Sequence, residues 1–155
     1  MQEHQHHCII TEVTEQEISQ IENELIRHAK HALVNAYAPY SNFKVGAAML
    51  FDDGQIYIGS NQENAAYPSG LCAERVVLFY AGSLFPQKKI VAIAITTAND
   101  AHEPAAPCGA CRQAMIEYEM KQQSAIKIFM ASASGKIYLS ESVENLLPMV
   151  FKLSL

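Results

Sequence analysis

Three of the four cysteines in the chain are spaced so that they could bind one metal ion. Cys108 and Cys111 are three residues apart, which places both thiols on the same face of a helix. Cys72 stands where another helix is predicted to begin. The partial positive charge and unpaired N–H groups of a helix N-terminus lower the pKa of a thiol and favour the metal-binding thiolate. The spacing therefore predicts a zinc site made by Cys72, Cys108 and Cys111.

A carboxylate next to these thiols indicates catalysis. Three protein ligands leave the fourth position of a tetrahedral zinc for water, as in catalytic sites. Glu74 follows Cys72 by two residues, so its carboxylate can lie beside that water, take its proton and pass the proton on as a general acid. Three thiolates leave the zinc site with a net negative charge. Arg75 and Arg112 are the adjacent cations that could offset it.

The spacing alone leaves other interpretations of these cysteines open. A single CxxC motif also occurs in redox sites, but a redox role leaves Cys72 and Glu74 unexplained. Cys8 would complete a closed, non-enzymatic zinc module with four cysteine ligands, although it lies in a polar segment before the first predicted helix. Cys72 could also simply fill a buried apolar position.

Composition limits the class of protein. The chain has 155 residues, half of them apolar, which suits one soluble globular domain. Its 11 basic and 16 acidic side chains give a net charge of −5, which argues against a nucleic-acid binder. No apolar run approaches the roughly 20 residues of a membrane helix, and residues 1–10 lack the features of a signal peptide. We expect a cytoplasmic protein with reduced thiols and no membrane partner.

The elements that must position the cysteines follow from the hydrophobic pattern. Residues 1–13, which include His4, His6, His7 and Cys8, are expected to form a flexible tail, followed by a single domain over 14–155. Thr14 and Glu17 fit a capping box, so the first helix is expected to begin there. Further helices are predicted at 72–81, with Gly82 as C-cap, at 108–120 and at 142–147; strands are predicted at 43–51, 55–60, 90–97, 126–131 and 136–139.

This order predicts an α/β fold with three layers, α/β/α, around a five-stranded mixed sheet. Asp53 and Gly54 indicate a hairpin, so the first two strands should be antiparallel. The helices that begin at Cys72 and Cys108 flank the strand at 90–97, so both are expected on one face of the sheet.

Two separated motifs make the chain resemble a known family. Cys72-Ala73-Glu74 and Pro107-Cys108-Gly109-Ala110-Cys111 resemble the signature of zinc-dependent deaminases, with Cys in place of the more usual His. Further segments narrow the resemblance to cytidine deaminases, and together they extend from about Thr14 to Phe151: they are Tyr40–Ala48, Asn61–Tyr67, Cys111-Arg112-Gln113 and Leu146-Leu147-Pro148 with Phe151.

The resemblance implies a reaction and its cofactor. Cytidine deaminases hydrolyse cytidine and 2′-deoxycytidine to uridine and 2′-deoxyuridine plus ammonia through a zinc-activated water, usually in pyrimidine salvage. One Zn²⁺ per subunit would be held by the three cysteines. Glu74 would move the protons, and Arg75 would temper the charge of the thiolates.

The resemblance also implies the substrate contacts. Phe43 would pack on the base, Ala73 would offer its backbone to the pyrimidine edge, and Asn61 and Glu63 would bind the ribose hydroxyl. Tyr67 and Phe151 would reach towards the site of a neighbouring subunit in a homotetramer. Without the resemblance, Phe43 would be taken as core, and Asn61 and Glu63 as ordinary loop residues.

Two rival enzymes share these motifs. A blasticidin-S-type or other aminonucleoside deaminase of the same fold would keep the cysteines and Glu74. The Asn61-x-Glu63 pair with Phe43 favours a substrate with ribose instead. An enzyme that edits bases in nucleic acid is disfavoured by the acidic charge.

Overall fold

The computed structural model describes residues 1–99 and 103–152, and a mixed sheet forms its centre. Six strands are hydrogen-bonded in the order β1-β6-β5-β4-β2-β3. Only β4 and β5 pair in parallel; the other neighbours are antiparallel, including the β2–β3 hairpin. The strands are β1 (Thr11–Val13), β2 (Val45–Phe51), β3 (Ile56–Ser60), β4 (Ile90–Thr97), β5 (Lys127–Ala131) and β6 (Ile137–Ser140).

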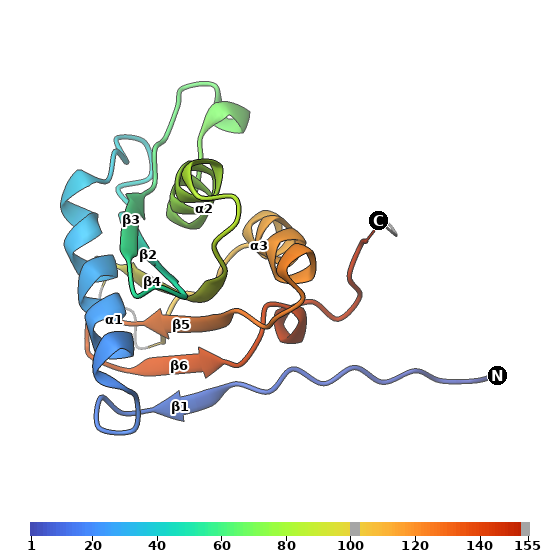
Figure 1. Cartoon of the computed structure of the whole chain (residues 1–155). Helices are drawn as coiled ribbons and strands as arrows, with labels where there is room; N and C mark the ends of the chain where they lie inside the picture. The colour runs from blue at the N-terminus through green and yellow to red at the C-terminus, as the bar shows by residue number, and fades with distance from the viewer. Residues whose placement is uncertain (100–102, 153–155) are drawn as a thin grey trace.

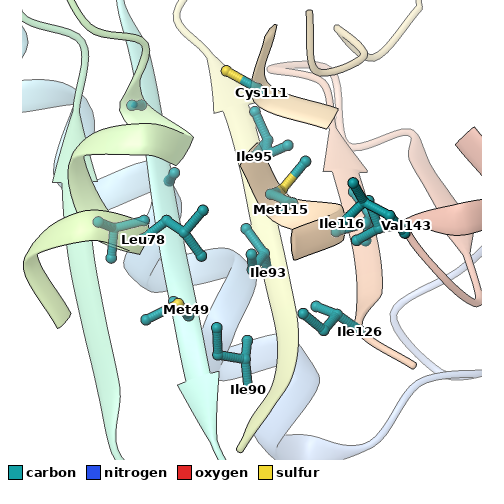
Figure 2. Packing of buried hydrophobic residues seen from close by; sticks show 14 of the residues in the cluster. Met49, Leu78, Ile90, Ile93, Ile95, Cys111, Met115, Ile116, Ile126 and Val143 are labelled. Atoms are coloured by element: carbon teal, nitrogen blue, oxygen red, sulfur yellow. The ribbon is translucent and has the colours of Figure 1, made fainter. Parts of the chain in front are cut away.

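Helices cover both faces of this sheet (Figure 1). Helix α1 (Gln20–Ala32) packs on one face, where Leu25 and Ala29 join the small residues Ala92 and Ala94 of β4. Helices α2 (Ala73–Leu84) and α3 (Gly109–Gln122) pack on the other face over Ile93 and its neighbours. Figure 2 shows this second core, in which side chains of α2 and α3 meet those of β2 and β4. The expected α/β fold is confirmed, as is the placement of both cysteine-bearing helices on one face.

The expected count of five strands is wrong. The sixth strand, β1, comes from the segment that was expected to be a tail, and it pairs with β6 through Thr11↔Leu139 and Val13↔Ile137. Three residues are too few to show a period-2 pattern, so no strand signal is visible there in the sequence. The strand forms because the neighbouring edge of β6 offers free backbone groups.

Helix α1 begins later than the capping-box pattern predicts. Thr14 and Glu17 do bond to each other, since the N–H and hydroxyl of Thr14 each donate to the Glu17 carboxylate at 2.8 Å. They form a turn before the helix. The helix itself starts after Ser19, which makes a complete capping box with Glu22. Two adjacent Ser/Thr-x-x-Glu motifs competed, and the second one caps the helix.

Two further boundaries differ from the prediction. Gly82 lies inside α2, which ends at Leu84, so it is not a C-cap. A Cβ at Gly82 would lie 2.6 Å from the Tyr118 ring, so glycine lets α2 and α3 pack closely. The helix expected at 142–147 is one 3-10 turn, Glu144–Leu146, and the amides of Val143 and Glu144 donate to the buried carboxylate of Glu119. Among the described residues, no helix is long and apolar enough to cross a membrane.

Candidate active site

The first turns of α2 and α3 bring three thiols together. Cys72 is the N-cap residue of α2, Cys108 is the N-cap residue of α3, and Cys111 lies in the first turn of α3. Their sulfurs all lie within 4.8 Å of one another, with Cys108 and Cys111 3.5 Å apart. Three soft donors at this separation fit one tetrahedral zinc with a fourth position open to the cavity. The prediction that these three cysteines meet is confirmed.

Cys8 does not complete a four-cysteine site. Within the described ranges, the three-thiol cluster is the one group of at least three potential His, Cys, Asp or Glu ligands, and Cys8 is exposed and outside it. The structure therefore does not support the closed four-cysteine module.

The pKa values of two thiols in the cluster are shifted in opposite directions. The pKa of the Cys72 thiol is lowered to about 5, mainly by a hydrogen bond from Cys111 and also by the Arg75 guanidinium, 3.8 Å from the Cys72 sulfur. The same contact raises the pKa of Cys111. Arg112 is occupied elsewhere, because its guanidinium donates to the carbonyls of Pro107 and Leu146 at 2.8 and 3.0 Å. Of the two candidate cations, only Arg75 contacts a cluster thiol.

Glu74 is buried beside this cluster, and one of its carboxyl oxygens has no hydrogen-bond partner among the described residues. Its side chain is 3% exposed, and the oxygen without a partner is Oε2. Burial raises the pKa of the Glu74 carboxyl above its ordinary value. A raised pKa makes it easier for this carboxyl to hold a proton between the steps of a reaction, as a residue that acts as both general base and general acid must.

A cavity of about 590 Å³ opens beside Glu74 and two of the thiols. This size is typical of small-molecule sites, which combine apolar walls with a few polar groups. Phe43, Val45 and Ile95 supply apolar wall. The polar and charged groups around it come from Tyr40, Ser41, Asn61, Gln62, Glu63, Asn64, Tyr67, Cys72, Glu74, Arg75, Thr97 and Cys108.

Asn61 and Glu63 line this cavity and also hold its wall in place. The Asn61 side chain accepts from the Val45 N–H at 2.9 Å and donates to the Phe43 carbonyl at 2.8 Å. Glu63 accepts from the backbone N–H groups of Tyr40 and Ser41, at 2.9 and 3.3 Å, and from the Ser41 hydroxyl. The hydroxyl is the main reason that the pKa of Glu63 lies below its ordinary value.

The other predicted contacts fall in three different places. Tyr67 lines the cavity of its own chain and packs edge-to-face on Tyr40, with ring centroids 6.0 Å apart. Ala73 is fully buried in the hydrophobic core and does not line the cavity. Phe151 is 70% exposed and lies outside the cavity wall, where its carbonyl accepts from Gln113 at 3.1 Å. The structure thus brings Tyr67 to the site within one chain, but not Phe151.

Several lining residues were not singled out from the sequence. Ser41 lies two residues before Phe43 and donates to Glu63, but a serine in a polar turn carries no distinctive signal. Ala105 and Ala106 also line the cavity and carry no signal either. Thr97 could have been predicted to line the site from the sequence. It shares one face of its strand with Ile93 and Ile95, and that face was expected to meet both cysteine-bearing helices.

Comparison with known proteins agrees with this geometry. Residues 19–127 match the family described as the cytidine and deoxycytidylate deaminase zinc-binding region. The chain belongs to this family. The cytidine deaminase of Halalkalibacterium halodurans is 42% identical over 82% of this chain and 91% of its own length. That of Sporosarcina psychrophila is 40% identical over 83% of this chain and 89% of its own length.

Solved structures of cytidine deaminases share the fold. The enzyme from Burkholderia pseudomallei superposes with a TM-score of 0.74 at 41% identity, over 86% of this chain and all of that one. The enzyme from Mycobacterium tuberculosis gives a TM-score of 0.66 at 33% identity, over 85% and 98% of the two chains. As a member of the cytidine and deoxycytidylate deaminase family, the chain is a zinc-dependent hydrolytic deaminase.

Proposed function

We propose that the protein hydrolyses cytidine and 2′-deoxycytidine to uridine and 2′-deoxyuridine with release of ammonia, in pyrimidine salvage. One observation carries this proposal: a buried carboxyl, Glu74, lies at the same cavity as a three-thiol cluster that fits zinc. When bound, zinc lowers the pKa of a coordinated water and so supplies a nucleophile near neutral pH.

Glu74 moves the protons of the reaction. It takes one proton from the attacking water and places it on N3 of the pyrimidine, while the water oxygen bonds to C4. It then takes the proton that remains on that oxygen and delivers it to the 4-amino group. The C4–N bond breaks, ammonia leaves, and a C4 carbonyl remains. The raised pKa of Glu74 suits both steps, because the group must accept and donate a proton at one pH.

Asn61 and Glu63 keep hydrogen-bonding capacity for the ribose. A carboxamide has two N–H donors and two acceptor sites, and the Phe43 and Val45 backbone uses one of each on Asn61. A carboxylate has about four acceptor sites, and Tyr40 and Ser41 fill three of those on Glu63. The remaining sites can bind ribose hydroxyls, while Phe43 packs on the base and the Ala73 backbone meets the pyrimidine edge.

The protein is further proposed to act as a homotetramer with shared active sites. Phe151 is 70% exposed and away from the cavity of its own chain, and Tyr67 is 74% exposed at the cavity mouth. Large exposed aromatic side chains are typical of interfaces.

We place the enzyme in the cytoplasm, because its three thiols must stay reduced to bind metal. Its net charge of −5 disfavours a nucleic-acid partner.

A substrate panel tests the proposal. Zinc-loaded protein is incubated separately with cytidine, 2′-deoxycytidine, free cytosine and blasticidin S, and ammonia release is followed. We expect turnover of the two nucleosides and little turnover of free cytosine, because the base lacks the ribose that Asn61 and Glu63 bind. Turnover of blasticidin S alone would show that the substrate assignment is wrong.

A further inference from the structure

Thr97 places a hydroxyl on the wall of the cavity. It is the last residue of β4, is 3% exposed, and lines the cavity. Side chains alternate along a strand, so Thr97 shares a face with Ile93 and Ile95, which pack against α2 and α3. It pairs across the sheet with Val45, which also lines the cavity.

This hydroxyl has no protein partner. Within residues 1–99 and 103–152, the Thr97 side chain makes no hydrogen bond, and Val45, the residue paired with it on β2, is apolar. The hydroxyl therefore faces the cavity with its hydrogen-bonding capacity unused by the protein. A polar group of a bound ligand would satisfy it.

The position of Thr97 indicates which part of the ligand it meets. The reacting carbon must lie at the end of the cavity that holds Glu74 and the thiols. That end is also the end of β4: Ile95 and Cys111 belong to one core cluster, and Figure 2 shows both at the same end of the strand. Thr97 follows Ile95 by two residues on the same face, so it lies at the end of the cavity where C4 of a bound ring must be placed.

We propose that the Thr97 hydroxyl accepts a hydrogen bond from the 4-amino group of the substrate base and so contributes to the selection of an amino-bearing pyrimidine. The inference rests on the proposed function, since it assumes a cytosine ring with C4 at the thiol cluster. It assigns Thr97 a contact with the leaving group, separate from the proton transfers of Glu74.

Two ligands that differ at C4 test this contact. Cytidine and pyrimidin-2-one riboside, which lacks the 4-amino group, are titrated by calorimetry into zinc-loaded Glu74→Gln, with and without Thr97→Val. Valine keeps the shape of threonine and removes the hydroxyl. In the Thr97→Val protein we expect the Kd for cytidine to rise about three- to tenfold, as for loss of a neutral hydrogen bond. The Kd for pyrimidin-2-one riboside should stay the same. Thr97→Ser, which keeps a hydroxyl, should retain cytidine affinity.

Thr96 provides the matched control. It precedes Thr97, is 1% exposed and also has an unpartnered hydroxyl among the described residues, but it lies on the opposite face with Ala92 and Ala94, towards α1. Thr96→Val should leave both Kd values and turnover unchanged. If Thr97→Val does not fold, Thr97→Ala and Thr97→Ser provide the same comparison.

The outcomes separate this inference from the proposed function. Unchanged cytidine affinity in Thr97→Val overturns the inference, and so does an equal loss for both ligands, which would indicate altered cavity shape. Failure of the wild-type protein to deaminate cytidine would instead defeat the proposed function.

Discussion

The Asn61 side chain fixes the backbone of Phe43, because its amide group donates to the Phe43 carbonyl at 2.8 Å while its oxygen accepts from the Val45 N–H at 2.9 Å. The residue proposed to bind ribose therefore also positions the aromatic ring proposed to bind the base. Affinity for the sugar and the shape of the base pocket are coupled through one side chain.

Replacing Asn61 should consequently affect both stability and substrate binding. Asn61→Ala leaves the carbonyl of Phe43 and the N–H of Val45 without partners at a position that is 8% exposed. We expect the free energy of unfolding to fall by roughly 1–3 kcal/mol and the KM for cytidine to rise about tenfold or more. Urea denaturation and steady-state kinetics measure the two effects. An unchanged KM would place the ribose contact elsewhere.

Ser41 should control the titration of Glu63. The Ser41 hydroxyl, with the amides of Tyr40 and Ser41, lowers the pKa of the Glu63 carboxyl below its ordinary value of 4.5. A lowered pKa stabilises the folded loop fully above about pH 4.5, and this stabilisation is lost as the pH falls through the lower folded-state value. Ser41→Ala should raise the pKa of Glu63, measured by carbon-13 NMR of its carboxyl. Identical titration curves for the two proteins would contradict the contact.

Replacing Cys108 should lower the zinc content of the protein, whereas replacing Cys8 should not. Cys108→Ser removes one of the three clustered sulfurs, so purified protein should contain markedly less zinc than the wild type. Cys8→Ser is the matched control, because Cys8 is also an exposed cysteine but lies outside the cluster. Metal analysis gives both values. Zinc loss in Cys8→Ser would restore the four-cysteine interpretation.

Phe151 should act on a neighbouring subunit's site. Phe151→Ala is expected to lower kcat/KM, while Glu74→Gln abolishes turnover. When the two variants are coexpressed, some sites combine an intact Glu74 from one chain with an intact Phe151 from another. The mixed oligomer should then exceed the summed activities of the two parents. No gain in oligomers shown to be mixed would contradict a shared site.

Most of the helices and strands that position the site could be predicted from local sequence patterns. The buried strand at 90–97 and the helices after Cys72 and Cys108 are each specified by their own residues, so their positions were predicted closely. Strand β1 and the start of α1 were not, because one depends on an edge offered by β6 and the other on competition between two similar capping motifs.

The residues that could do chemistry were easier to predict than the hydrogen bonds that hold the cavity wall in place. Cysteine spacing indicates the metal cluster, and the neighbouring Glu74 indicates the proposed acid–base residue, without knowledge of the fold. The bonds from Asn61 to Phe43 and Val45 join residues that are 18 and 16 positions apart in the sequence. Such contacts depend on tertiary structure, which no local pattern specifies.

The role of Glu74 is tested by comparing ammonia release from cytidine by the wild-type protein and by Glu74→Gln, with equal zinc content in both. Glu117→Gln on the exposed side of α3 is the matched control for the chemical change. We expect one ammonia per cytidine consumed by the wild type and by Glu117→Gln, and a loss of roughly 10²–10⁴-fold in kcat for Glu74→Gln without loss of thermal stability. Near-normal turnover by folded, zinc-loaded Glu74→Gln would contradict the central role of this carboxyl.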